Sequence, residues 1–221
     1  MECLNLQDPE QGAGYLSTQP QGGWESMLVQ LAKIHGCHVV GVVGASHKVE
    51  LVKQLGCDHI IDKSKEDLWK VSESYAPKGY QVVFDANGVE TLQESYEHLA
   101  PGGKLVIYGF HTMLPRSSDS GTGEISLWQW IKLGWNYKST PLFNPMKMTA
   151  DNKSVMAFNL SFLFDRRDIL EESMAQLLHW VKRGLLKVSK VTAYPLKEVG
   201  KAHSDLESGQ TMGKLVLTMD E

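Results

Sequence analysis

The stretch "QPQGGWESMLVQLAKIHG", residues 19–36, joins a pair of glycines to the pattern of an amphipathic helix. Gly22 and Gly23 stand where a phosphate-binding loop needs glycine, and the apolar residues after them recur at helical spacing. Trp24 and Glu25 occupy positions where small residues are expected, and a carboxylate there would repel a bound phosphate. The stretch therefore predicts a nucleotide-binding loop that is altered at the two residues after its glycines.

Strand and helix patterns alternate after this loop. Short β-branched runs indicate buried parallel strands, and the amphipathic segments between them indicate helices. The strand patterns include "HVVGVVG" at 38–44, "YQVVFDANG" at 80–88 and "KLVIYGF" at 104–110. This order predicts an α/β fold with a Rossmann-type, doubly wound parallel sheet. Few apolar residues precede the loop, so we expect the first strand to be poor or missing, or else an irregular strand within 15–21.

The chain divides into two unequal parts. Residues 1–25 are expected to form an irregular N-terminal segment, and residues 26–221 a dinucleotide-binding, Rossmann-type domain. A stretch rich in Ser, Gly and Pro at about 111–124 predicts a flexible loop within that domain, and a Trp-rich helix pattern follows it.

Composition excludes several classes of function. The net charge of -4 argues against a nucleic-acid partner, and no apolar run approaches the length of an integral membrane segment. Three widely spaced cysteines and scattered histidines offer no metal-ligand spacing, so we expect no metal site. With no signal-peptide pattern at the N-terminus, a cytoplasmic location is the expectation.

Candidate binding residues follow the predicted strands. The second strand ends without the Asp or Glu that usually binds the ribose hydroxyls of NAD; Ser46 and Lys48 stand nearby and suit the 2′-phosphate of NADP. The alternative is that Ser46 only caps the next helix and that Lys48 is solvated. Lys63, after the third strand, can reach an adenosine phosphate or can be an exposed loop lysine. Gly88 and Gly109 end later strands, where they either let the protein backbone approach the cofactor or form plain turns.

Several segments, in order, carry a family resemblance. "MLVQLAKIHGC", "VELVKQLGCDHIID", "FDANG", "LAPGGKLVIYGF", "AFNLSFLF" and "ESGQTMGKLVL" resemble the zinc-independent medium-chain dehydrogenases/reductases. Within them the chain is most similar to the quinone-oxidoreductase group and its vesicle amine transport protein branch. The resemblance implies NADPH as cofactor, hydride transfer to quinones or α,β-unsaturated carbonyls, no zinc, and a homodimer.

The resemblance also implies roles for individual residues, although it implies no obligatory catalytic acid, so we name no catalytic residue. Ser46 and Lys48 would hold the 2′-phosphate, with Lys63 near it. The ribose and nicotinamide path would be lined by Asn87, Gly88, Gly109 and Phe110. The nicotinamide end would be approached by Phe158, Asn159 and Leu160, and the site closed by Gly213 and Lys214.

Two departures from the family pattern set up an alternative. Family members carry an N-terminal domain that supplies much of the substrate cleft, and this sequence is expected to lack it. The family glycine loop reads A-A-G-G-V-G-S, whereas this chain reads "QPQGGWES". The alternative function is therefore a catalytically silent isoform that acts as a dimerising interaction module.

Overall fold

Six parallel strands form the main sheet of the chain. The computed structural model describes residues 14–17, 23–110, 127–188, 190–208, 211 and 213–219. The strands of the main sheet are β1 (Gly14–Ser17), β2 (His38–Val43), β3 (His59–Asp62), β4 (Tyr80–Asp85), β5 (Leu99–Ile107) and β6 (Ser154–Ala157). They lie in the order β3-β2-β1-β4-β5-β6. This is the strand order of a doubly wound Rossmann-type sheet, so the predicted fold class is confirmed.

The first strand is present, which corrects the expectation that it is missing, but it is short, in line with the expectation of a poor strand. β1 is four residues long and pairs in parallel with β2 on one side and with β4 on the other. Leu16 lies opposite Val40 and Val83 in the two ladders. Hydrogen bonding to two neighbouring strands compensates for the low apolar content of this segment, and the centre of the sheet is closed. Gly22 lies outside the described residues, and Gly23 is the first residue of the helix after β1.

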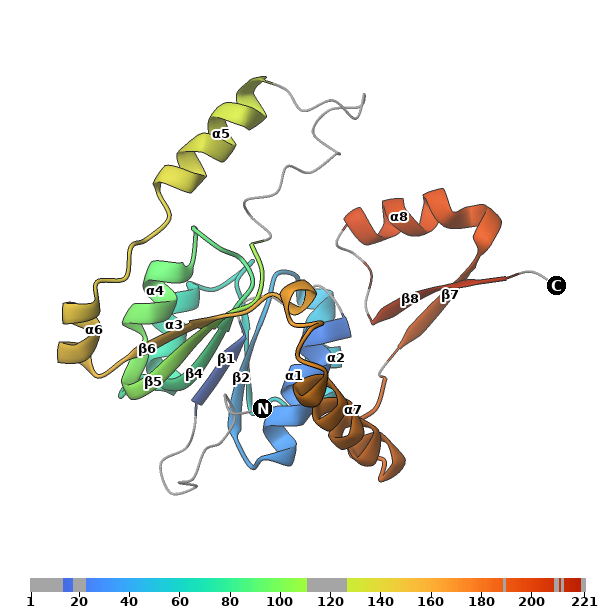
Figure 1. The fold of residues 1–221 in the computed structure, drawn as a ribbon, viewed down its shortest axis with the longest axis horizontal. Helices are drawn as coiled ribbons and strands as arrows, with labels where there is room; N and C mark the ends of the chain where they lie inside the picture. The colour runs from blue at the N-terminus through green and yellow to red at the C-terminus, as the bar shows by residue number, and fades with distance from the viewer. Residues whose placement is uncertain are drawn as a thin grey trace.

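Helices cover both faces of the sheet (Figure 1). The longer ones are α1 (Gly23–Ile34), α2 (Val49–Gln54), α3 (Leu68–Tyr75), α4 (Leu92–Glu97), α5 (Leu127–Lys138), α6 (Pro145–Asp151), α7 (Arg167–Lys182) and α8 (Val199–Glu207). α3, α4 and α6 lie on one side of the sheet, and α1, α2 and α7 lie on the other.

The two layers of core alternate along each strand. In β2, Val40 and Val42 belong to the cluster under α3 and α4, whereas Val39 belongs to the cluster under α1. All three side chains are almost completely buried. Burial on both faces is why the strands read as continuous apolar runs. Gly41 is needed within β2, because a Cβ there would lie 2.9 Å from both Val52 and Cys57.

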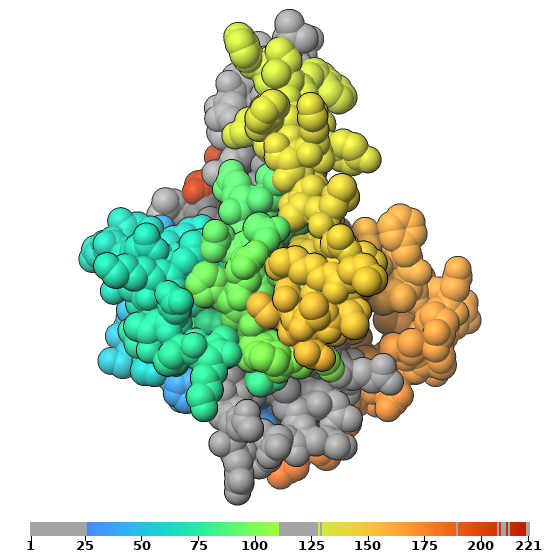
Figure 2. Space-filling model, turned by 90° about the vertical axis from the view of Figure 1, so that its left-hand side faces the viewer, coloured from blue at the N-terminus to red at the C-terminus, as the bar shows by residue number. Residues whose placement is uncertain are grey.

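Two parts of the chain lie apart from the main sheet. Helix α5 projects from the body of the molecule, and the loop predicted at 111–124 before it lies outside the described residues (Figures 1 and 2). β7 (Val191–Pro195) and β8 (Lys214–Thr218) form a separate parallel pair beside α8. None of the helices in the described part of the chain combines the length and apolar composition that crossing a bilayer requires.

Candidate functional site

The candidate site is the edge of the sheet at which the parallel strands end. β1 is the strand from which the chain proceeds outward to β2 and β3 on one side and to β4, β5 and β6 on the other. In open α/β sheets, ligands bind outside the carboxyl ends of the strands at this topological switch point. Most of the predicted site residues follow strands and therefore meet at this edge.

Ser46 and Lys48 follow β2 in a short 3-10 helix, Ser46–Lys48. Ser46 is exposed, whereas Lys48 is 4% exposed, so the alternative of a solvated Lys48 is wrong. Ser46 makes no capping hydrogen bond to the helix that follows, which corrects the alternative that it is an N-cap. Its hydroxyl instead donates to the Asp62 carboxylate over 2.5 Å, because a buried anion is the stronger acceptor.

Asp62 ends β3 and was missed as a site residue in the sequence. It is 7% exposed, and its second oxygen accepts from the Ser64 amide at 3.0 Å and from the Ser64 hydroxyl at 2.5 Å. The hydrogen bonds from Ser46 and Ser64 lower the pKa of Asp62, against the opposing effect of burial. A carboxylate therefore does lie beside the end of β2, supplied by the neighbouring strand. Lys63 follows it, is exposed, and passes near Gly44, where a Cβ would meet its Cε at 3.5 Å.

The loop after β4 is organised by the buried carboxylate of Asp85. Asp85 accepts from the backbone N–H groups of Asn87 at 2.8 Å and Gly88 at 3.3 Å. It also accepts from the hydroxyls of Thr91 and Ser95. Gly88 has a φ of +101°, a backbone conformation that glycine adopts without strain. The backbone at Asn87 and Gly88 is thus held in one conformation at the switch point.

The ends of β5 and β6 place apolar side chains at the same edge. Gly109 packs against Ala86, which a Cβ would approach to 3.3 Å, and Phe110 is exposed. Phe158, the residue after β6, donates its backbone N–H to the carbonyl of Ile107, the last residue of β5, so the two strands stay side by side to their ends. Three exposed residues follow β6 directly: Phe158, Asn159 and Leu160.

Other predicted site residues are placed differently. The side-chain oxygen of Asn159 accepts from the Ser161 amide at 3.0 Å, so it caps a short turn. Gly213 and Lys214 lie at the start of β8, in the two-stranded sheet, where the Lys214 amide donates to Lys190. Figure 1 shows this sheet apart from the strand ends, so the structure does not bring these two residues together with the others. Their role in closing the site stays a prediction.

Metal-ligating groups do not gather in the part of the chain that the structure describes. No three His, Cys, Asp or Glu side chains there come together as ligands of one ion. Cys37 and Cys57 are free thiols, and burial raises the pKa of Cys57 to about 12. These two thiols pack in the layer beneath α1.

The sheet order and the arrangement of residues at its carboxyl edge define a Rossmann-type domain. Residues 55–217 match the family model described as zinc-binding dehydrogenase. The chain belongs to this zinc-binding dehydrogenase family, and its relatives include quinone oxidoreductases and VAT-1 homologues.

Curated relatives are similar over most of this chain. A probable quinone oxidoreductase of Leishmania amazonensis is 30% identical over 91% of this chain and 55% of its own length. A 2-haloacrylate reductase of a Burkholderia species is 30% identical over 89% of this chain and 52% of its own. A synaptic vesicle membrane protein VAT-1 homolog of Danio rerio is 26% identical over 90% and 39%. The chain thus spans about half or less of the length of these relatives.

Solved structures show the same fold. A quinone oxidoreductase of Pseudomonas syringae superposes with a TM-score of 0.70 at 24% identity, over 97% of this chain and 59% of that one. A quinone oxidoreductase of Escherichia coli, complexed with NADPH, gives a TM-score of 0.70 at 22% identity, over 97% and 60%. At these identities the likeness establishes the architecture alone.

Proposed function

We propose that the chain binds NADPH and takes part in hydride transfer of the quinone-reductase type. The observation that carries this proposal is the strand order β3-β2-β1-β4-β5-β6, with Ser46, Lys63 and Gly88 at the carboxyl ends of three of its strands. The Lys63 ammonium group would donate to a phosphate of the dinucleotide, the Ser46 oxygen would contact its ribose, and glycine at 88 would let the backbone come close to the cofactor. The NADPH complex of the Escherichia coli relative supports the same assignment.

The residues at the adenosine end fit a phosphorylated ribose. Lys63 is exposed and supplies positive charge beside the end of β2, and Lys48 lies buried in the turn that follows that strand. Ser46 lies at the mouth of the same turn, with its proton donated to Asp62. In this assignment the two lysines provide the attraction for a 2′-phosphate.

The nicotinamide end would lie toward β5 and β6. Asp85 fixes the Asn87–Gly88 turn through its hydrogen bonds to the two amides. At Gly88 the protein backbone, rather than a bulky side chain, would therefore lie next to the cofactor. Phe110, Phe158 and Leu160 are exposed apolar side chains that would exclude water from the face of a bound ring. The cofactor, when bound, supplies the hydride, and we assign its acceptor to quinones or α,β-unsaturated carbonyls by likeness to the relatives.

Titration of the purified chain with NADPH and NADH tests this function. Saturable binding, followed by calorimetry or by nicotinamide fluorescence, is the expected result. A folded chain that binds neither cofactor at millimolar concentration would contradict the proposal. A cytoplasmic location and independence of zinc stay predictions alongside it.

One observation favours the second candidate, a catalytically silent module that dimerises. Trp128 and Trp135 lie seven residues apart on α5, hence on one face, and their exposed fractions are 79% and 68%. Exposed apolar patches of this kind mark interaction surfaces. β6 also ends the main sheet on one side, with Phe158 exposed beyond it. A second copy of the chain is the partner that this candidate assigns to these surfaces.

Dimerisation without cofactor binding would favour the silent module over the enzyme. Sedimentation equilibrium on the same preparation that is titrated with NADPH separates the two candidates. A dimer that binds NADPH fits the enzyme, whereas a dimer that binds neither cofactor fits the interaction module.

A further inference from the structure

The hydrogen bond between Ser46 and Asp62 joins an exposed serine to a buried aspartate. Ser46 is exposed, Asp62 is 7% exposed, and the two side-chain oxygens are 2.5 Å apart. The register of the sheet produces this contact, because Val43 at the end of β2 lies opposite Asp62 at the end of β3. The other Asp62 oxygen is occupied by the hydroxyl and amide of Ser64.

The contact fixes which way the Ser46 hydroxyl can act. A serine hydroxyl carries one proton and two acceptor lone pairs. Since the proton is donated inward to Asp62, the oxygen of Ser46 presents only acceptor positions outward. An outward acceptor receives a hydrogen bond from a ribose hydroxyl, but it offers none to a phosphate.

The charge of Asp62 acts in the same direction. The hydrogen bonds from Ser46 and Ser64 lower its pKa, so the carboxylate is ionised at neutral pH. A 2′-phosphate seated at Ser46 would meet this negative charge one hydroxyl away. Lys63 and Lys65 are exposed cations on the loop that follows, and the charge of Lys65 also helps to lower the Asp62 pKa.

We propose that Asp62 is a positioning residue that acts through Ser46, and that this pair favours a 2′-hydroxyl over a 2′-phosphate on the adenosine ribose. The proposal rests on the proposed function, namely that this edge binds an adenine dinucleotide. The lysines attract the phosphate while the Ser46–Asp62 pair opposes it. The chain therefore accepts both NADPH and NADH, with a preference for NADPH that is narrower than the lysines alone would give.

The test compares two adenosine nucleotides that differ at the 2′ position. Adenosine 2′,5′-bisphosphate and adenosine 5′-monophosphate are titrated by calorimetry into the full chain and into Asp62→Asn. Removing the carboxylate charge and letting an amide donate to Ser46 is expected to shift the affinity ratio toward the bisphosphate by about tenfold. The matched control is Asp58→Asn, an exposed acid just before the same strand at the opposite edge, which should leave the ratio unchanged.

A second variant tests directly whether Ser46 accepts a hydrogen bond from the ligand or donates one to it. Ser46→Ala removes the Ser46 oxygen and leaves the buried Asp62 in place. It therefore provides the test if Asp62→Asn fails to fold. We expect Ser46→Ala to weaken the monophosphate several-fold without weakening the bisphosphate. Greater loss for the bisphosphate would show that Ser46 donates to the phosphate, and would overturn the proposal.

Failure of the inference is distinguishable from failure of the proposed function. A wild-type chain that binds NADPH, with an affinity ratio that Asp62→Asn leaves unchanged, keeps the function and overturns the role of Asp62. A folded wild-type chain that binds neither NADPH, NADH nor either nucleotide overturns both.

Discussion

Ser95 donates its hydroxyl to the carboxylate of Asp85 at 2.7 Å, and both residues are completely buried. This hydrogen bond joins α4 to the end of β4. The same carboxylate receives the backbone N–H of Asn87, so one buried anion links the core to the candidate cofactor loop. The loop at the switch point is therefore coupled to the stability of the whole domain.

Asp85→Ala should destabilise the fold by about 3 kcal/mol, because it leaves buried hydroxyl and amide donors without their acceptor. Urea unfolding followed by circular dichroism measures the change. Asp67→Ala is the matched control: Asp67 is an exposed helix N-cap that accepts from two backbone amides, and its loss should remove about 1 kcal/mol. Equal effects of the two substitutions would contradict the role given to Asp85.

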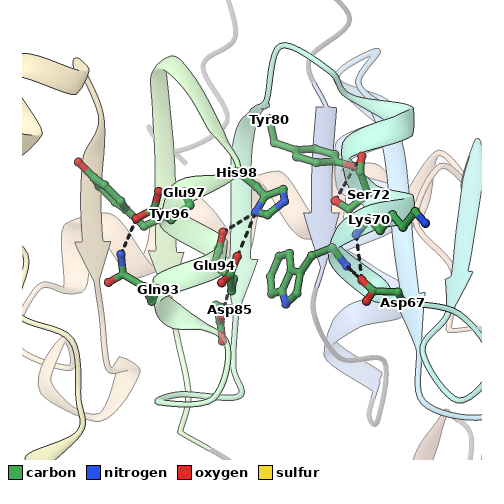
Figure 3. Close-up of polar contacts among 12 residues, drawn as sticks. Asp67, Lys70, Ser72, Tyr80, Asp85, Gln93, Glu94, Tyr96, Glu97 and His98 are labelled. Carbon is green, nitrogen blue, oxygen red and sulfur yellow. Dashed lines mark hydrogen bonds and ion pairs between the residues drawn. The ribbon is translucent and has the colours of Figure 1, made fainter.

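The buried phenol of Tyr80 gives a second test of the core. Its hydroxyl donates to the Ser72 carbonyl at 2.8 Å and accepts from the Ser72 hydroxyl at 3.0 Å (Figure 3). Tyr80→Phe should lose about 1 to 2 kcal/mol of unfolding free energy. The double variant with Ser72→Ala should lose less than the sum of the single changes, since one hydrogen bond joins the two side chains and either substitution removes it. Strict additivity in urea unfolding would argue against the pair.

Most of the fold follows from local sequence patterns. The runs at β2, β4 and β5 are apolar and β-branched, and their burial on both faces requires helices on both sides of the sheet. β1 is harder to predict, because "GYLS" contains only two large apolar residues. Its pairing with β2 and β4 comes from backbone hydrogen bonds, which leave little trace in side-chain patterning.

The candidate site was less predictable than the fold for a related reason. Glycines and polar residues at strand ends are visible in the sequence, so Ser46, Lys63 and Gly88 can be named as candidates from it. Asp62 lies 16 residues from Ser46, and only the register of β2 and β3 brings the two together. The sequence also shows nothing of the separate sheet that carries Gly213 and Lys214 away from the strand ends.

Lys63→Ala should lower the affinity for NADPH by about tenfold and leave that for NADH within a factor of two. An exposed cation that faces a 2′-phosphate contributes to the phosphorylated cofactor alone. Fluorescence titration of both cofactors measures the ratio. Lys78→Ala, at an exposed lysine just before β4 and so at the opposite edge, is the control. Equal weakening of NADPH and NADH would remove Lys63 from the phosphate site.

The acid dependence of stability should report the Ser46–Asp62 hydrogen bond. The bonds from Ser46 and Ser64 lower the pKa of Asp62 in the folded chain below its unfolded value of about 3.9. The resulting stability is complete above that unfolded value and is lost as the pH falls through the folded pKa. Ser46→Ala raises the pKa back toward its ordinary value, so the stability difference between variant and wild type should shrink from pH 6 to pH 3. Urea unfolding across that range, with the Asp62 carboxyl titrated by NMR, measures it, and a constant difference would contradict it.

Replacing the two aligned tryptophans of α5 tests the surface assigned to a second copy. Trp128→Ser with Trp135→Ser removes apolar area from one helix face, so the dimer dissociation constant should rise at least tenfold. The unfolding free energy of the main sheet should stay unchanged, because the two side chains are largely exposed. Sedimentation equilibrium over a range of concentrations measures the association, and Leu142→Ser, at a residue 96% exposed beyond the end of the helix, is the control. A dimer that the double variant leaves intact would place the interface elsewhere, with the open edge at β6 the next surface to substitute through Ala157→Lys.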